Sequence, residues 1–436
     1  MADTIFALAT ARGRAGIAVI RVSGPAAGAA AEALTGAAMR PGAPRLRWLR
    51  DPGTGDRLDQ ALVLGFAAPR SFTGEDVAEL QLHGGPAVVR SVLEALSGIT
   101  GLRLAEPGEF TRRALLNGRV DLAQVEGLGD LIAAETAAQQ RQAMRMMDGA
   151  LSRLGAAWGE ALIGALALLE VSIDFADEEL PADLHASARD GLARVVAAMD
   201  RELAGSRAAE RIRDGFEVAL VGPPNVGKST LLNALAGRDV ALTSEVAGTT
   251  RDVIEVRLDL DGLPLTLLDT AGLREAGEAG EVVEALGIER ARSRAEASDL
   301  RLFLVDEAGD VAGLGVTRQP DDIVALAKAD LRVADGALAV SGTTGVGIEG
   351  LLGAVSASLG ERAASAGTVS NGRHREAVAR ARRAVAAAAE LAGPSARVEI
   401  AAEEIRAALR ALDFLLGKVD VEAVLDVVFR NFCLGK

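Results

Sequence analysis

The sequence is poor in the residues that make disulfide bridges and metal sites. Among 436 residues there are one cysteine, three histidines and no tyrosine. Because Cys433 stands alone, an internal disulfide is excluded, and the composition suits a reducing compartment. His83, His185 and His374 lie far apart in the sequence. We therefore do not expect a zinc site built from clustered histidine and cysteine ligands.

The chain also has no net positive charge. The chain has 47 Lys and Arg against 61 Asp and Glu, for a net charge of -14. Bulk charge therefore does not attract nucleic acid, and any contact with RNA needs a local basic patch or a partner protein. Arginines gather between 373 and 383, where a solvated helix face and a phosphate contact are both open readings. The hydrophobic content of 49% is typical of a globular protein.

Targeting and membrane signals are not evident. Residues 1–4 lack a basic segment followed by an apolar core, and the longest apolar stretch, 161–169, is closed by Glu160 and Glu170. That stretch is too short to span a bilayer. The terminal residues 433–436 occupy the frame of a prenylation signal, but Gly435 and the final lysine disagree with it. We expect a cytoplasmic protein.

What the chain does contain is a change of pattern along its length. Residues 1–118 alternate short strand and helix patterns, with strands expected at 17–22, 61–66 and 77–83. This predicts a small α+β domain. Two charged residues on its strands, Arg21 and Glu79, suit either a solvated strand face or a binding site, and the two readings carry equal weight.

Residues 119–215 predict long helices, at 124–147, 152–171 and 186–209, with short breaks near 148–149 and 178–183. Residues 216–370 return to alternating strands and helices, the pattern of a doubly wound α/β domain. Residues 371–436 are helical again. The simplest topology inserts the α/β domain into a helical domain.

The segment 222-GPPNVGKST-230 fits the phosphate-binding P-loop. A hydrophobic strand pattern at 216–221 precedes it and a helix pattern at 229–235 follows it, as the motif requires. Lys228 would supply positive charge to the β- and γ-phosphates, and the Ser229 hydroxyl would bind Mg²⁺.

Two downstream segments complete a nucleotide site. The hydrophobic strand pattern 265–269 ends in Asp269-Thr270-Ala271-Gly272, where Asp269 would act through the Mg²⁺ shell and Gly272 would sense the γ-phosphate. Thr250 is the candidate threonine of the Mg²⁺ and γ-phosphate switch.

The base-reading segment is expected after the strand 322–326. There Ala327-Lys328-Ala329-Asp330 stands where most GTPases have Asn-Lys-x-Asp. The Asp330 carboxylate can accept two hydrogen bonds from guanine, which favours GTP over ATP. Ala327 removes a side-chain contact, at a cost of order 1 kcal/mol. Ser341 and Gly342, after a strand at 337–340, would close over the base.

With these pieces in place, the whole chain resembles the tRNA-modification GTPase family called MnmE or TrmE. The strings that carry the resemblance are Asp3-Thr4-Ile5, Gly13-Arg14-x-Gly16, Arg21-Val22-Ser23-Gly24, Ser71-Phe72-Thr73-Gly74-Glu75-Asp76, His83-Gly84-Gly85, Glu106-Pro107-Gly108-Glu109-Phe110-Thr111-Arg112-Arg113-Ala114, Asn117-Gly118-Arg119-Val120-Asp121-Leu122 and Phe432-Cys433-Leu434-Gly435-Lys436. It implies a multidomain α+β protein with an N-terminal α/β folate-binding domain, a helical domain and an inserted Ras-like P-loop α/β GTPase domain.

The resemblance also implies ligands. A reduced folate, 5,10-methylene-tetrahydrofolate or its 5-formyl analogue, would bind the N-terminal domain of a homodimer through Arg21, Glu79, Arg119 and Lys436. Potassium would take the place of an arginine finger, with Asn225, Ser244, Val246 and Thr249 as its ligands and Ser229 and Thr250 holding Mg²⁺. The positions expected to bind GTP are Asn225, Val226, Gly227, Lys228, Ser229, Thr230, Ser244, Thr249, Thr250, Asp269, Thr270, Ala271, Gly272, Ala327, Lys328, Asp330, Ser341 and Gly342.

For catalysis the resemblance places a water-orienting glutamate at Glu284, since Leu273 stands where Ras-like proteins have glutamine. Cys433 is a catalytic thiol or a structural residue, with equal weight. With the flavoprotein MnmG (GidA), which carries FAD in a heterotetramer, the family adds an aminomethyl or carboxymethylaminomethyl group to C5 of the wobble uridine of tRNA. The alternatives are a switch GTPase of ribosome assembly and a folate-dependent methyltransferase with GTP as effector.

Overall fold

The computed structural model describes residues 3–175, 183–238, 240–242, 255–269, 289, 292–331, 337–393, 397–419 and 435. The chain forms two compact units. One comprises residues 1–129 and 413–436, and the other comprises residues 130–412. The finer division into four ranges given above stays a prediction.

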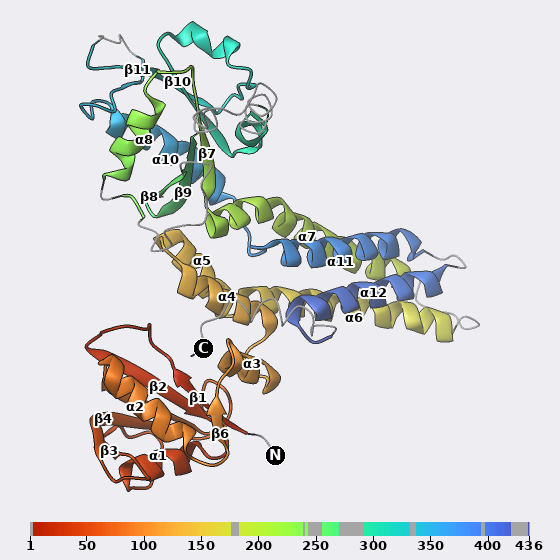
Figure 1. Ribbon diagram of the computed structural model, residues 1–436. Helices are drawn as coiled ribbons and strands as arrows, with labels where there is room; N and C mark the ends of the chain where they lie inside the picture. Colours follow the sequence, from red (N-terminus) through yellow and green to blue (C-terminus); the bar gives the residue numbers. More distant parts are fainter. Residues whose placement is uncertain are drawn as a thin grey trace. The chain divides into compact units, whose positions relative to one another are not determined.

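The N-terminal unit is built on a six-stranded sheet among its described residues, in the order β3-β4-β5-β2-β1-β6. Its strands are β1 (Thr4–Leu8), β2 (Ile17–Ser23), β3 (Arg45–Arg50), β4 (Arg57–Phe66), β5 (Val77–His83) and β6 (Leu102–Leu104). Helices α1 (Ala27–Thr35) and α2 (Pro86–Ser97) share a hydrophobic core with one face of this sheet (Figure 1). That core contains Phe6, Ile20 and Leu80.

The opposite face of this sheet is only partly covered. Near β1, helix α3 (Glu109–Leu116) packs Phe110 against Ile5 and Ala7, and Phe72 joins this cluster. Near β3, Leu46 and Trp48 are 59% and 44% exposed. The sheet therefore has a covered half and an open half on the same face.

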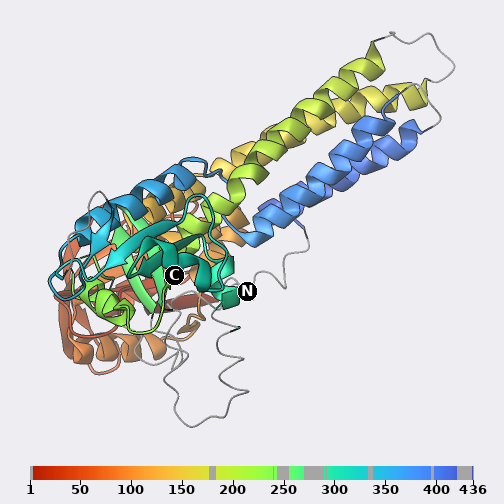
Figure 2. The same cartoon turned by 90° about the horizontal axis from the view of Figure 1, so that it is seen from above.

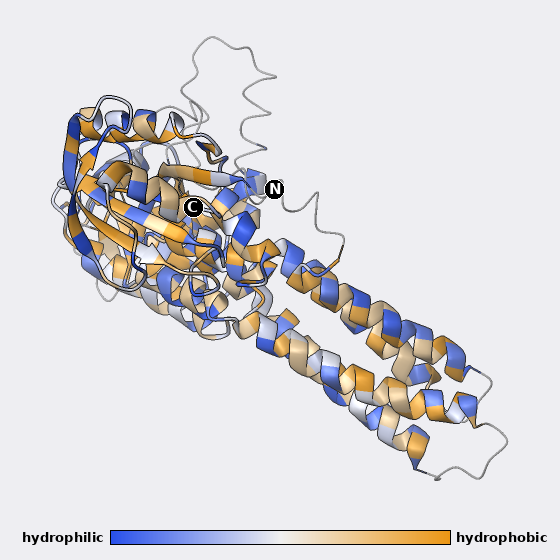
Figure 3. Cartoon of the chain, turned by 90° about the horizontal axis from the view of Figure 1, so that it is seen from below, coloured by the Kyte–Doolittle hydropathy of each residue, from blue (hydrophilic) through white to orange (hydrophobic). Residues whose placement is uncertain are grey.

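Long helices follow in the second unit. They are α4 (Leu122–Ala133), which begins in the first unit, α5 (Ala137–Met147), α6 (Ala150–Asp174), α7 (Leu184–Asp214), α11 (Gly372–Leu391) and α12 (Val398–Leu416). Figures 1 and 2 show α6, α7, α11 and α12 running side by side. Figure 3 shows hydrophobic and hydrophilic residues mixed along them, as expected where one stripe packs and the other faces water.

The helix predicted over 124–147 is wrong in one respect, because it is two helices. The chain breaks between α4 and α5, and Thr136 caps α5 with a reciprocal capping box to Gln139. The Thr136 side chain accepts a hydrogen bond from the Gln139 main-chain N–H, so the start of α5 is satisfied locally. The apolar spacing continues across this break and conceals it.

Helix α6 is long and apolar enough to cross a membrane by length and composition, with 22% of its most apolar window buried. This is weak evidence, since a helix of a soluble bundle meets the same criterion. In the described residues α6 packs against α7, and Glu170 on α6 forms an ion pair with Arg406 on α12.

The α/β part of the second unit contains a second six-stranded sheet among its described residues, in the order β12-β11-β10-β7-β9-β8. Its strands are β7 (Phe216–Val221), β8 (Glu255–Leu260), β9 (Leu263–Asp269), β10 (Leu300–Val305), β11 (Ile323–Ala327) and β12 (Ala339–Val340). All pairings are parallel except that of β8 with β9. Helices α8 (Lys228–Ala236) and α10 (Ile348–Ala364) share one hydrophobic core with this sheet. The 3-10 helix η1 (Ala308–Gly313) contributes to a second core on the other face. The predicted fold class is confirmed.

The α/β part enters and leaves the helical part at neighbouring points. The Gly367 N–H donates to the carbonyl oxygen of Gly205 on α7 at 3.2 Å. A Cβ atom on Gly205 would lie 2.6 Å from the Gly367 nitrogen, so only glycine allows this approach. Helix α7 then packs against α11. The α/β part is thus an insertion in a helical bundle.

Candidate functional site

The predicted nucleotide residues collect at the carboxyl edge of the second sheet. The P-loop follows β7, Asp269 ends β9, Ala327 ends β11 and Ser341 follows β12. Because β7, β9, β10, β11 and β12 run parallel, these segments meet at one edge. That edge is where ligands bind open α/β sheets.

In the P-loop, Asn225 and Gly227 have φ angles of 61° and 112°, in the left-handed region. This conformation turns the loop before α8 starts at Lys228. The Lys228 side chain lies under the loop, where its Nζ donates to the carbonyl oxygens of Gly222 and Pro223, both at 2.8 Å. Val226 is buried, while Ser229 and Thr230 are exposed on the first turn of α8.

Two further segments stand beside the P-loop. Asp269 is 5% exposed and is the partner of Leu220 in the pairing of β7 with β9. A Cβ atom on Gly342 would lie 2.7 Å from the Leu231 nitrogen, so the Ser341–Gly342 turn packs directly on α8. Ser341 is buried, and its hydroxyl accepts a hydrogen bond from the Thr344 N–H at 3.2 Å.

The segment after β11 has a special backbone. Ala327 is buried, Lys328 has a φ of 59°, and Asp330 is exposed in the following turn. The Lys328 Nζ lies 3.1 Å from the Asp306 carboxylate. Asp306 directly follows the buried strand β10, a signal that would have allowed its prediction. The sequence reasoning missed this residue.

Several predicted residues lie outside the described residues. They are Ser244, Val246, Thr249, Thr250, Thr270, Ala271, Gly272, Glu284, Cys433 and Lys436. Among the residues that the structure describes, no group of three His, Cys, Asp or Glu side chains is placed to hold a metal ion.

A second candidate site lies on the N-terminal sheet. Arg21 and Glu79 face each other in the register of β2 and β5. The Arg21 Nε and Nη2 atoms lie 2.9 Å and 2.8 Å from Glu79 Oε1, and both side chains are about four-fifths buried. The Arg21 guanidinium also stands 5.9 Å and 5.8 Å from the ring centres of Phe72 and Phe110. Sequence reasoning singled out Arg21 and Glu79 but missed both aromatic neighbours.

Arg119 and the chain end border the same sheet. The Arg119 side chain packs on Gly74, where a Cβ atom would lie 3.1 Å from its Cγ. Gly435 is buried against the backbone of Leu8 and Ala9, at the end of β1 beside β2. The structure therefore brings Arg21, Glu79, Arg119 and the residue before Lys436 to one unit.

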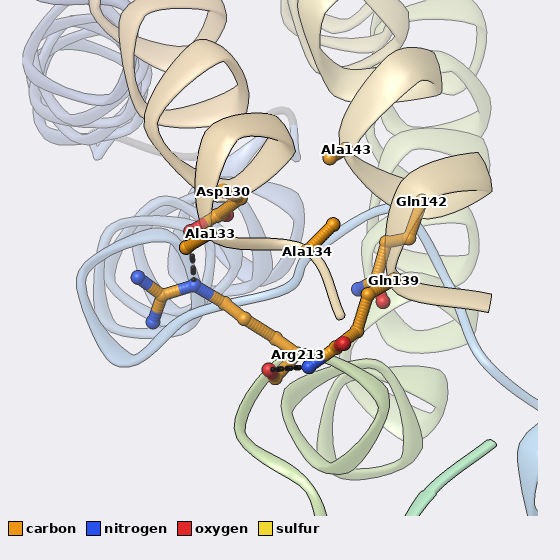
Figure 4. A pocket seen from close by; sticks show the side chains of 7 residues that line it. All are labelled: Asp130, Ala133, Ala134, Gln139, Gln142, Ala143 and Arg213. Atoms are coloured by element: carbon orange, nitrogen blue, oxygen red, sulfur yellow. Dashed lines mark hydrogen bonds and ion pairs between the residues drawn. The ribbon is translucent and has the colours of Figure 1, made fainter. Parts of the chain in front are cut away.

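A small cavity in the second unit belongs to neither site. It lies where α4, α5 and α7 meet and is lined by Asp130, Ala133, Ala134, Gln139, Gln142, Ala143 and Arg213 (Figure 4). The Arg213 Nε donates to Asp130 at 2.8 Å, and the Gln139 side chain donates to the Arg213 carbonyl oxygen at 3.0 Å. These bonds fix the helix packing next to β7.

Three arginines of α11 form ion pairs with carboxylates. Arg375 pairs with Glu210, Arg380 with Glu376 and Arg382 with Asp200. These contacts favour the solvated helix face over the phosphate contact.

The comparisons with known proteins agree over the full chain. A family model described as MnmE helical domain matches residues 122–433, and another, GTP-binding protein TrmE N-terminus, matches residues 4–119. The tRNA modification GTPases MnmE of Ruegeria pomeroyi and Cereibacter sphaeroides are 56% and 55% identical to this chain, with 100% of each chain covered. Among solved structures, the G domain of the T. maritima FeoB iron transporter is 24% identical, with a TM-score of 0.25, over 34% of this chain and 98% of that chain.

Two family models that together span nearly all of the sequence, and relatives aligned from end to end, lead to one conclusion: the chain belongs to the family of tRNA modification GTPases MnmE.

Proposed function

We propose that this chain is a potassium-activated, cytoplasmic GTPase that works with the flavoprotein MnmG (GidA). Together they would use a reduced folate to add an aminomethyl or carboxymethylaminomethyl group to C5 of the wobble uridine, position 34, of certain tRNAs. The observation that carries the proposal is the presence of two chemically different sites in one chain. One is a P-loop edge with a buried lysine, and the other is the Arg21–Glu79 pair on a separate sheet.

The first site fits a nucleotide triphosphate. Lys228 can exchange its bonds to two neutral carbonyl oxygens for bonds to phosphate oxygens, which are stronger because they carry charge. The Ser229 hydroxyl and the Asp269 carboxylate are oxygen donors of the kind that Mg²⁺ prefers. The exposed Asn225 amide offers an oxygen to K⁺ beside the phosphates, where K⁺ would neutralise developing charge.

The second site fits a folate. Glu79 can accept hydrogen bonds from the amino and ring N–H groups of a pterin, while Arg21 and Arg119 suit an anionic tail. Arg21 and Glu79 satisfy each other's charge and hydrogen bonding. A ligand that carries both N–H donors and carboxylates can engage each partner without leaving the other unpaired.

The open half of the N-terminal sheet supports a homodimer. Leu46 and Trp48 on β3 and Ile17 on β2 are 59%, 44% and 64% exposed. Exposed apolar groups gathered on one sheet face favour burial against a second subunit. The proposed folate site lies on the covered half of the same face. The dimer contacts and the folate contacts would therefore be neighbours on one sheet face.

The uridine chemistry would need groups beyond the described residues. Cys433 and Glu284 are the proposed catalytic residues of modification and GTP hydrolysis. The net charge of -14 fits a subunit that leaves most of the grip on tRNA to MnmG.

Mass analysis of wobble uridines tests this proposal. In cells that lack this chain, tRNAs should lose the aminomethyl-type modification, and the intact chain should restore it. Lys228→Ala and Arg21→Gln variants should each fail to restore it, because each removes one of the two sites. Normal wobble uridines in the deletion strain would refute the modification role and leave a switch GTPase of ribosome assembly.

A further inference from the structure

The loop 71–76, between β4 and β5, contacts two proposed folate residues. Its Phe72 ring centre lies 5.9 Å from the Arg21 guanidinium. Its Gly74 contacts the Arg119 side chain. The loop therefore contacts both of the cationic residues that the folate tail would use.

Hydrogen bonds to Glu75 and Thr73 hold this loop in place. Glu75 Oε2 accepts a hydrogen bond from the Ser23 hydroxyl at 2.7 Å. The Arg113 Nη1 donates to both Glu75 oxygens at 3.2 Å. The Asn117 side chain donates to the Thr73 carbonyl oxygen at 2.7 Å. Two of these three anchors come from α3 or the residue that follows it.

Arg113 on α3 connects this loop to the start of the chain. Its Nη1 also donates to the Asp3 carbonyl oxygen at 2.9 Å, and its Nη2 donates to Asp3 Oδ1 at 2.7 Å and to Glu109 Oε1 at 3.0 Å. Its side chain is 12% exposed. A guanidinium is the one side chain with enough donors in a fixed plane for these acceptors.

We propose that Arg113 is a positioning residue for the folate site: it holds Glu75, and through Glu75 it holds the loop that carries Phe72 and Gly74. This inference rests on the proposed folate binding and extends it to a residue that does not itself face Arg21. A merely structural role for Arg113, in stabilising the N-terminal unit, is the alternative to be separated.

Arg103 provides a matched control. It binds the same two carboxylates, Asp3 and Glu109, at 2.5 Å each. None of its hydrogen bonds or ion pairs among the described residues involves Glu75. Arg103→Gln therefore disturbs the same charge network without releasing the loop.

The experiment uses the full-length chain. Binding of 5-formyl-tetrahydrofolate is measured by calorimetry for wild type, Arg113→Gln, Arg103→Gln and Glu75→Gln, together with GTP turnover and thermal unfolding. We expect Arg113→Gln and Glu75→Gln to weaken folate binding about tenfold, and Arg103→Gln to change it by less than about twofold. GTP turnover should stay at the wild-type rate in all of them.

The rate of limited trypsin digestion measures how firmly the loop is held. Arg70, exposed just before the loop, should be cleaved faster in Arg113→Gln and Glu75→Gln than in wild type or Arg103→Gln. In the double variant Glu75→Gln/Arg113→Gln the loss of folate affinity should equal that of either single variant, because both act through one contact. Arg113→Lys should restore part of the affinity.

The outcomes are distinct. Equal effects of Arg113→Gln and Arg103→Gln on folate affinity and cleavage would overturn the positioning role and leave a structural one. If wild type binds no folate, the proposed folate function fails, while the cleavage rates at Arg70 still decide whether Arg113 holds the loop. If Arg113→Gln does not fold, Glu75→Gln carries the test alone.

Discussion

The two candidate sites hold their cationic side chains in different surroundings. On the N-terminal sheet, Arg21 and Glu79 form an ion pair, and the Arg21 guanidinium also lies near two aromatic rings. At the edge of the second sheet, the Lys228 ammonium donates to neutral carbonyl oxygens of its own loop. The first candidate site therefore suits a ligand that offers both donors and anions. The second suits a strongly anionic ligand, since phosphate oxygens bind an ammonium group more strongly than neutral carbonyl oxygens do.

The comparison predicts that the two sites can be disabled separately. Lys228→Ala should lower GTP hydrolysis by about 100- to 1,000-fold, because it removes a preorganised charge from the phosphates. Folate affinity should not change. Phosphate release measures the first quantity and calorimetry the second. A parallel loss of folate binding would show that the two sites are not independent.

Arg21→Gln should have the reverse effect. It should weaken 5-formyl-tetrahydrofolate binding by about 10- to 100-fold, since it removes a charged contact and leaves the Glu79 carboxylate without its arginine. GTP turnover should stay normal. Arg45→Gln, at the exposed start of β3, is the control and should bind folate as wild type does. Unchanged affinity in Arg21→Gln would remove Arg21 from the site.

Because the P-loop edge should bind a strongly anionic ligand, the identity of the monovalent cation should affect GTP turnover. GTP turnover should be faster in K⁺ than in Na⁺ buffer, and Asn225→Ala should reduce the K⁺ rate by about tenfold with little change in Na⁺. Pro224→Ala, beside it on the same exposed turn, should keep the K⁺ preference. Equal wild-type rates in the two salts would exclude potassium activation.

Ala327 allows a test in the direction of gain. Ala327→Asn should tighten GTP binding by about fivefold, in line with one added hydrogen bond of order 1 kcal/mol. Binding of ATP should remain weak. The control, Ala329→Asn, changes the same segment without occupying the position before Lys328. If the affinity falls instead, the buried space around Ala327 is too small for asparagine.

The smallest effect concerns acid stability of the N-terminal unit. Burial alone would raise the pKa of Glu109, but hydrogen bonds from Arg103, the Glu106 N–H and Arg113 lower it below 4.5. Its stabilising contribution is thus present above pH 4.5 and lost as pH falls through the lowered pKa. Glu109→Gln should lower the free energy of unfolding at pH 7 by about 1 kcal/mol, because a neutral amide makes weaker hydrogen bonds to Arg103 and Arg113 than a carboxylate does. In urea titrations the difference in unfolding free energy from wild type should shrink as the pH falls below 4.5; a constant difference would contradict this.

Local patterns were sufficient to predict much of the fold. Strands Val77–His83 and Phe216–Val221 begin and end where the sequence places them, because alternation and the P-loop context are local signals. The α4–α5 break was missed because apolar spacing runs through it and the Thr136 cap interrupts only three residues.

Pairings between distant residues were harder to predict. The charges Arg21 and Glu79 were visible, but their direct pairing depends on the register of β2 and β5, 58 residues apart. The contacts of Asp306, Phe72 and Arg113 were not predicted for the same reason, since their partners Lys328, Arg21 and Glu75 come from other segments. Sequence motifs identify such residues without stating what they contact.

The contact between Gly205 and Gly367 has a consequence for the folding of the helical bundle. The insertion between them leaves the bundle and returns to it at hydrogen-bonding distance. Once the α/β part has folded, its two ends lie close together. The pairing of α7 with α11 then costs little loop-closure entropy. Unfolded, the same insertion would impose a closure entropy that grows by about 0.6 kcal/mol with each doubling of loop length. The pairing of α7 with α11 therefore becomes more favourable after the inserted part folds, which gives the assembly of this unit a preferred order.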